Sequence, residues 1–113
     1  MRANDVHQNL AQLSRELVEL LGEYQRSNIA RAKAEQTYKV AYASAYLSAE
    51  GSIEERKQRA TLTTADQARD AAIAEVTFDN IRAALRVLGQ RLDAGRTIAS
   101  TIRAEAIATG VGT

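Results

Sequence analysis

Residues 74–106 decide the fold, and they read AEVTFDNIRAALRVLGQRLDAGRTIASTIRAEA. Small or apolar residues recur in this stretch at alternating intervals of four and three, at Ala74, Phe78, Ile81, Leu85, Leu88, Leu92, Gly95, Ala99, Ile102 and Ala106. A mean interval of 3.5 residues is the period of a helix that packs lengthwise against another helix. The unbroken pattern therefore predicts one long packed helix over residues 65–107.

A second row of this kind occupies the N-terminal part of the chain, at Val6, Leu10, Leu13, Leu17, Leu20 and Tyr24. Asn4 or Asp5 can cap the start of this helix, because their side chains accept hydrogen bonds from free backbone N–H groups. The row is lost at the polar residues 26–28. We therefore expect a helix over residues 5–25, a break or kink at 26–28, and a second, alanine-rich helix over residues 29–49.

The sequence after residue 49 carries a turn signal. Gly51 suits the left-handed position that follows a helix. Ser52 and Glu55 have the spacing of a capping box, in which the serine accepts a backbone N–H and the glutamate reaches back to the serine N–H. A helix is expected over residues 53–60, because the threonines that follow are poor helix formers. Thr64 to Gln67 form a second candidate capping box; alternatively, the helix that starts at Ile53 continues without a stop.

These elements predict an all-α fold in one domain, residues 1–113, with a flexible tail at 109–113. The expected architecture is a long antiparallel helical hairpin with an additional N-terminal helix and coiled-coil-like seams. A hairpin of this length has a thin core, so we expect it to be completed by self-association into a homodimer or small homo-oligomeric bundle. A monomeric three-helix bundle is the competing interpretation. The predicted packing seam comprises Leu10, Leu13, Leu17, Leu20, Tyr24, Phe78, Ile81, Leu85, Leu88, Leu92 and Ile102.

Composition excludes several classes of chemistry. The 113 residues include 15 Lys and Arg, 14 Asp and Glu, one histidine and no cysteine, for a net charge of +1. Disulfides and Cys-ligated zinc are excluded, and neither a phosphate-binding glycine loop nor a nucleophile elbow is present. No apolar run approaches the ~18 residues of a membrane-spanning helix. We expect no catalytic residues, no metal, no cofactor, no membrane partner and a cytoplasmic location.

Arginines dominate the charge of residues 82–103, where Asp93 alone opposes Arg82, Arg86, Arg91, Arg96 and Arg103. Arg82, Arg96 and Arg103 are separated by multiples of seven and so share one stripe beside the seam. One interpretation is a stripe that contacts phosphates, with an affinity that falls steeply in salt. The alternative, which we favour, is a solvated flank that pairs with acids such as Glu16, Glu19 and Glu23 on another helix.

Two further groups are candidate partner-binding residues. Tyr38, Tyr42 and Tyr46 lie four apart among basic residues, so they either stack on the bases of a single strand or pack as amphipathic core residues. Packing is the favoured interpretation. Glu55, Arg56 and Lys57 belong to a charge cluster that suits either a solvated helix start or a docking surface.

Residues 34–59 resemble a family of short helical proteins from the early region of tailed bacteriophages of actinobacteria and related hosts. The resemblance is carried by Tyr46-Leu47-x-Ala49-Glu50-Gly51-Ser52-x-Glu54-Glu55-Arg56-Lys57 and, further on, by the style of Leu88–Ala94 and Ile102–Glu105. It implies a protein of the host cytoplasm, encoded near recombination and replication functions, with no assigned reaction.

Together these features suggest a non-catalytic, self-associating helical phage protein that binds macromolecules. The first hypothesis is an accessory to phage DNA recombination or replication, with nucleic acid or a phage protein as partner. The alternative is an inhibitor or adaptor that binds a host protein.

Overall fold

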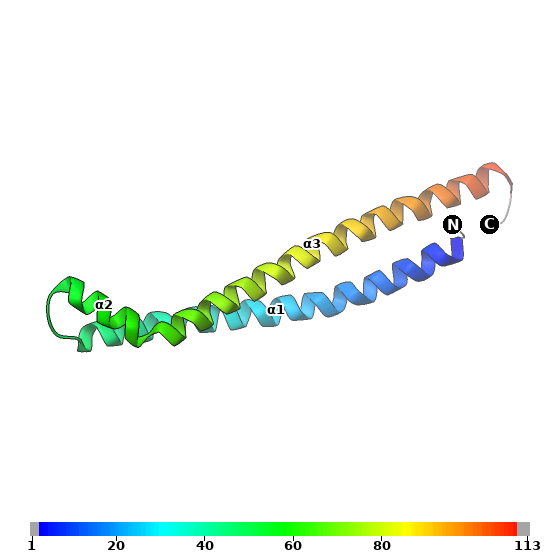
Figure 1. Ribbon diagram of the computed structural model, residues 1–113. Coiled ribbons are helices and arrows are strands. Elements are labelled where there is room, and N and C mark those ends of the chain that lie inside the picture. The colour runs from blue at the N-terminus through cyan, green and yellow to red at the C-terminus, as the bar shows by residue number, and fades with distance from the viewer. Residues whose placement is uncertain (1–2, 111–113) are drawn as a thin grey trace. The chain divides into compact units, whose positions relative to one another are not determined.

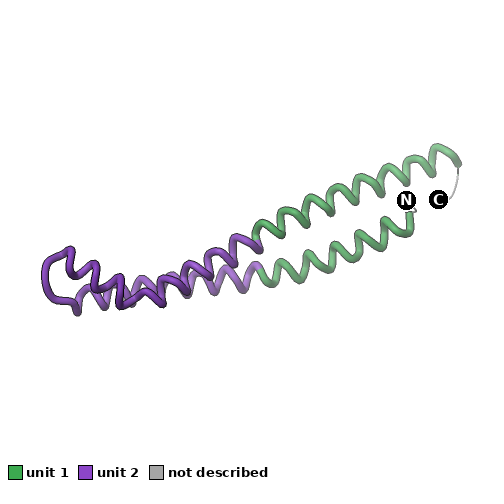
Figure 2. The backbone as a smooth tube through the Cα atoms, viewed as in Figure 1, with its two compact units in different colours: residues 1–23, 82–113 green, residues 24–81 purple. Residues whose placement is uncertain are grey.

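The computed structural model describes residues 3–110, and these form three helices: α1 (Ala3–Ser48), α2 (Ile53–Thr63) and α3 (Ala65–Ala108) (Figure 1). No strand occurs among the described residues, so the predicted all-α class is confirmed. The chain divides into two compact units (Figure 2). Unit 1 combines residues 1–23 with 82–113, and unit 2 comprises residues 24–81. Each unit is described by itself below.

α3 matches the helix that the 3.5-residue period predicts, to within one residue at its C-terminal end. Every position of the predicted row from Ala74 to Ala106 is buried or half-buried. The covered positions also continue toward the start of the helix at the same intervals, through Ala71, Gln67 and Thr64. Beyond the helix, Thr109 and Gly110 donate backbone hydrogen bonds to Glu105 and Ile107. The rest of the expected tail, 111–113, lies outside the described residues.

The expected break at residues 26–28 is wrong, because α1 is one continuous helix from Ala3 to Ser48. The covered positions keep their intervals of three and four through Tyr24, Ser27, Arg31 and Ala34. Ser27 is buried, and its hydroxyl donates to the Tyr24 carbonyl at 3.0 Å, so its polar group is satisfied without leaving the helix. α1 therefore continues through a stretch without an apolar row, because polar side chains occupy its buried and half-buried positions there.

The turn between α1 and α2 follows the predicted chemistry. Gly51 has φ +110°, a backbone conformation that favours glycine. Ser52 is the N-cap of α2, and its Oγ accepts the Glu55 backbone N–H at 3.2 Å. The carboxylate of Glu55 accepts the Ser52 hydroxyl at 3.2 Å, where a reach back to the serine N–H was expected. The helix start is thus capped by the serine as predicted.

α2 ends at Thr63, three residues beyond the expected end of this helix at Ala60, and Thr64 separates it from α3. Threonine hydroxyls donate to the carbonyl four residues earlier, as in Thr61 to Lys57 at 2.9 Å, so their polar groups are satisfied while the helix continues past its expected stop. Thr64 is buried, and its hydroxyl donates to Ala60 at 2.7 Å. Among the described residues, no backbone N–H donates to this hydroxyl and Gln67 Oε1 has no hydrogen-bond partner, so the second predicted capping box does not form.

Unit 1 is an antiparallel pair of helix segments built on leucines. Leu13, Leu88 and Leu92 are buried together. The leucines that pack against this core are half-buried, and they are Leu10, Leu17 and Leu20. The segments run in opposite directions, because Leu20 lies beside Ala84 whereas Leu10 lies beside Gly95. Burying one such leucine contributes about 1.5–3 kcal/mol, so this single layer of side chains holds the pair together.

Unit 2 is held by an aromatic and ionic contact between α1 and α3. The rings of Tyr24 and Phe78 are 5.2 Å apart, and the Arg31 guanidinium lies 4.8 Å from the centre of the Phe78 ring. Arg31 also forms ion pairs with Glu75 at 3.7 Å and with Glu35 at 3.9 Å. At the other end of this unit, the small buried residues are Ala49, Ala60 and Thr64. Their size allows α2 to lie close to the end of α1.

Candidate helix-docking surfaces

The two helix segments of unit 1 carry opposite charge. Residues 3–23 contain four acidic residues and one arginine, whereas residues 82–110 contain five arginines and two acidic residues. The described structure contains no ion pair between Glu16, Glu19 or Glu23 and any of Arg86, Arg91, Arg96 and Arg103. The favoured pairing of these arginines with these glutamates is therefore not seen among the described residues. Glu19, Glu23 and the four arginines are exposed, whereas Glu16 is half-buried.

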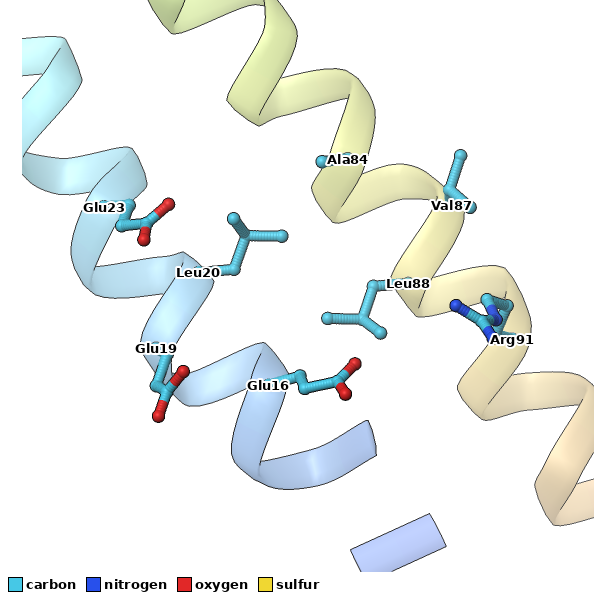
Figure 3. A pocket seen from close by; sticks show the side chains of 8 residues that line it. All are labelled: Glu16, Glu19, Leu20, Glu23, Ala84, Val87, Leu88 and Arg91. Atoms are coloured by element: carbon cyan, nitrogen blue, oxygen red, sulfur yellow. The ribbon is translucent and has the colours of Figure 1, made fainter. Parts of the chain in front are cut away.

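The glutamates line a groove between α1 and α3, which we call the acidic groove (Figure 3). Its volume is about 410 Å³, and it is lined by Glu16, Glu19, Leu20, Glu23, Ala84, Val87, Leu88 and Arg91. In Figure 3 the glutamates come from α1, while Leu20 and Leu88 lie between the helices. Val87 is 54% exposed. The groove thus combines a negative wall with apolar surface and only one arginine.

Four arginines occupy the other flank of α3, and we call Arg82, Arg86, Arg96 and Arg103 the basic edge. All four are exposed. Arg82, Arg86 and Arg96 lie five or nine positions from Arg91, which places them about 140–180° around the helix axis from it. Arg96 pairs with Asp93 at 3.5 Å, and both side chains are largely exposed. Arg86 and Arg103 form no ion pair within the described residues.

The separation of charge follows from which residues face each other across the helix pair. On the flank of the basic edge, α1 contributes His7, which lines a cavity of about 160 Å³ together with Arg103 and apolar residues. Ser14 and Leu21 follow His7 at intervals of seven and therefore lie on the same side of α1. None of these three is acidic. Among the described residues, Arg86, Arg96 and Arg103 consequently form no ion pair with a carboxylate of α1.

Two glycines of α3 differ in what surrounds them. A Cβ added at Gly95 would lie 2.7 Å from Leu10 Cδ2, so the absence of a side chain there allows the two helices of unit 1 to approach closely. A Cβ added at Gly89 would meet nothing within 4 Å. Gly89 lies between Arg86 and Arg96, and a glycine inside a helix costs about 1 kcal/mol relative to alanine. Packing within the chain gives no reason for it.

The remaining candidates lie in unit 2. Tyr38 and Tyr42 are half-buried, with rings 6.3 Å apart at 74°, an edge-to-face contact that fits the packing interpretation. The Glu55 carboxylate accepts the hydroxyl of the N-cap Ser52 and Lys57 is exposed, whereas Arg56 is half-buried with its Nε lacking a hydrogen-bond partner. Two apolar side chains at helix ends in this unit are exposed: Leu47, near the end of α1, at 80%, and Leu62, near the end of α2, at 79%.

Neither metal coordination nor a membrane span is indicated by the described residues. No group of three or more His, Asp or Glu side chains within residues 3–110 is placed to hold a metal ion. Over the same range, every helix falls short of the combination of length and hydropathy that crossing a bilayer requires.

Sequence reasoning missed the acidic groove as a site. The sequence pattern indicates Glu16, Glu19 and Glu23 only as partners of arginines, and nothing in it singles out Val87. Their spacing of three and four along α1 was a readable signal, because it places all three on one side of a helix. The chain matches no protein-family model, and the comparisons with curated proteins and with solved structures likewise gave no match.

Proposed function

We propose that this protein is non-catalytic and acts by self-association and by binding macromolecular partners through its exposed helix surfaces. One observation carries the proposal: unit 1 places three glutamates and exposed Val87 on one flank, and Arg86 and Arg103 on the other, and among the described residues no ion pair joins these glutamates to these arginines. This arrangement adds no contact between the helices of a single chain. An association surface, by contrast, needs charge without an internal partner beside exposed apolar area.

Sedimentation velocity tests self-association. The chain has a mass of 12.3 kDa, so a monomer is readily distinguished from larger species. We expect the mean mass to rise with protein concentration between about 1 and 100 µM and to fall when salt is raised from ~50 to ~500 mM, because salt screens exposed charges. A mass of 12.3 kDa under all of these conditions would contradict the proposal.

The partner that we propose first is nucleic acid, in an accessory role in phage DNA recombination or replication within the host cytoplasm. The exposed arginines of the basic edge support it, as does the resemblance of residues 34–59 to early-region phage proteins. Fluorescence anisotropy with labelled single- and double-stranded DNA at ~50 mM salt is the test. Binding should weaken steeply with salt and in an Arg86→Glu/Arg103→Glu variant, and an absence of binding to either probe would argue against this role.

A second candidate is an adaptor or inhibitor that binds a host protein. It is favoured by the exposed side chains of Leu47, near the end of α1, and Leu62, near the end of α2, both in unit 2. Affinity capture from a host lysate, compared between the wild type and a Leu47→Ser/Leu62→Ser variant, tests it. A specific host protein should be captured by the wild type and lost in the variant, and equal capture by both would count against this surface.

A further inference from the structure

We propose that the acidic groove of one copy receives the basic edge of a second copy of this chain. The proposal rests on the self-association proposed above and identifies the two surfaces that meet. Both surfaces belong to unit 1, and they lie on opposite flanks of α3.

Charge is the first argument. The acidic groove has three glutamates and one arginine, Arg91. The basic edge has four arginines, and the acidic side chain among them is Asp93. Juxtaposing the two surfaces therefore places positive charge against negative charge, with Glu19 and Glu23 lacking any ion-pair partner within the described residues. Charge complementarity of this kind selects and orients partners.

Shape is the second argument. The groove has an apolar side formed by Leu20, Leu88 and exposed Val87. The aliphatic stems of arginine side chains can cover such surface while the guanidinium groups reach the glutamates. Gly89 lies in the middle of the basic edge with open space above its Cα. Because Gly89 has no side chain, the backbone of α3 can approach a helix of the second copy closely. The proposed contact therefore accounts for a glycine that packing within the chain leaves unexplained.

The same charges disfavour the alternative contact, in which the acidic grooves of two copies face each other. A two-fold axis relating two acidic grooves would collect six glutamates and two arginines, and like charges in one interface oppose association. A groove-to-edge contact is heterologous, so a pair of copies leaves one groove and one edge unused. Such contacts continue into a closed ring or an open stack. We therefore expect species larger than a dimer at high concentration.

Charge reversal in two matched variants tests the proposal. The groove variant is Glu19→Lys/Glu23→Lys, and the edge variant is Arg86→Glu/Arg96→Glu. Arg82 stays unchanged because it has contacts of its own within the chain. A control variant, Lys33→Glu/Lys39→Glu, makes the same change of charge as the edge variant, at exposed positions of unit 2. Circular dichroism at 222 nm verifies helicity, and neutral variants, Glu19→Gln/Glu23→Gln and Arg86→Gln/Arg96→Gln, replace any reversal that fails to fold.

Sedimentation velocity should show that each reversal alone weakens self-association by roughly tenfold or more, with a smaller loss for the glutamine variants. The control variant should associate like the wild type. Mixing the two reversed variants should restore association, because the groove and edge of each then meet an oppositely charged surface on the other. If the wild type is monomeric, the proposed function itself fails. If the wild type associates but the edge variant associates equally well, or if mixing restores nothing, the groove-to-edge contact is wrong while self-association stands.

Discussion

Replacing each of two glycines of α3 by alanine separates helix propensity from packing. Both residues lie inside the helix, so Gly89→Ala and Gly95→Ala each gain about 1 kcal/mol of intrinsic helix stability. At Gly89 the new Cβ meets nothing within 4 Å, so the gain should be realised in full. The free energy of unfolding should rise by about 1 kcal/mol.

At Gly95 the new Cβ would lie 2.7 Å from Leu10 Cδ2, about 1 Å closer than an ordinary carbon–carbon contact. Leu10 must retreat from the leucine core of unit 1, and overpacking of this kind costs about 1–3 kcal/mol. The two effects oppose each other, so Gly95→Ala should be neutral or destabilising by up to about 2 kcal/mol. The two variants should therefore differ by about 1–3 kcal/mol.

Urea unfolding followed by circular dichroism at 222 nm, at a protein concentration below self-association, measures both variants. A second replacement, Leu10→Ala, should remove most of the penalty at Gly95, because the clashing methyl group is gone. If Gly95→Ala stabilises the chain as much as Gly89→Ala, the close approach of α1 and α3 at this position is refuted. Gly89→Ala should also weaken self-association while it stabilises the monomer, since Gly89 lies in the basic edge.

Five further substitutions test the packing of unit 1, the N-cap of α2 and the ionic contact of unit 2. Leu92→Ala should lower the free energy of unfolding in urea by about 2–4 kcal/mol, because Leu92 is only 3% exposed. Val18→Ala, at 71% exposure, should change it by less than about 0.5 kcal/mol, and equal effects of the two variants would contradict the packing of unit 1. Ser52→Ala should lower stability by about 1 kcal/mol, and Ser52→Asp should restore it; an unchanged alanine variant would show that the α2 cap contributes nothing. Arg31→Met should lower the free energy of unfolding by less than about 1 kcal/mol, because the ion pairs of Arg31 are partly exposed. A larger loss of stability in thermal unfolding would show that the contact of Arg31 with the Phe78 ring contributes more than this.

The sequence predicts the helices best where apolar spacing is regular. The row from Ala74 to Ala106 identified α3 and its covered positions, because a strict period leaves one helical interpretation. Prediction from apolar spacing fails at residues 26–28, because the polar residues Ser27 and Arg31 occupy positions of α1 that are buried or half-buried. Ser27 hides its hydroxyl on the Tyr24 carbonyl, and Arg31 covers the Phe78 ring with its guanidinium. Neither arrangement can be read from hydropathy.

The docking surfaces were less predictable than the helices. Sequence spacing shows that Arg82, Arg96 and Arg103 share a stripe, but not which residues of α1 face that stripe. The pairing of Leu10 with Gly95, and of Leu20 with Ala84, fixes that relation. It places the glutamates on the flank away from the arginines. Register between helices depends on side-chain packing across the pair, so the acidic groove required the structure.

Intermolecular disulfide formation tests the central claim, groove-to-edge association, most directly. The chain has no cysteine, so a Glu19→Cys variant and an Arg86→Cys variant each carry one thiol. When the two are mixed at a concentration that supports association and oxidised, the account predicts a disulfide-linked heterodimer that forms faster than either homodimer and whose formation is suppressed by high salt. Homodimers of Glu19→Cys as the dominant product, or no cross-link in an associated sample, would contradict it.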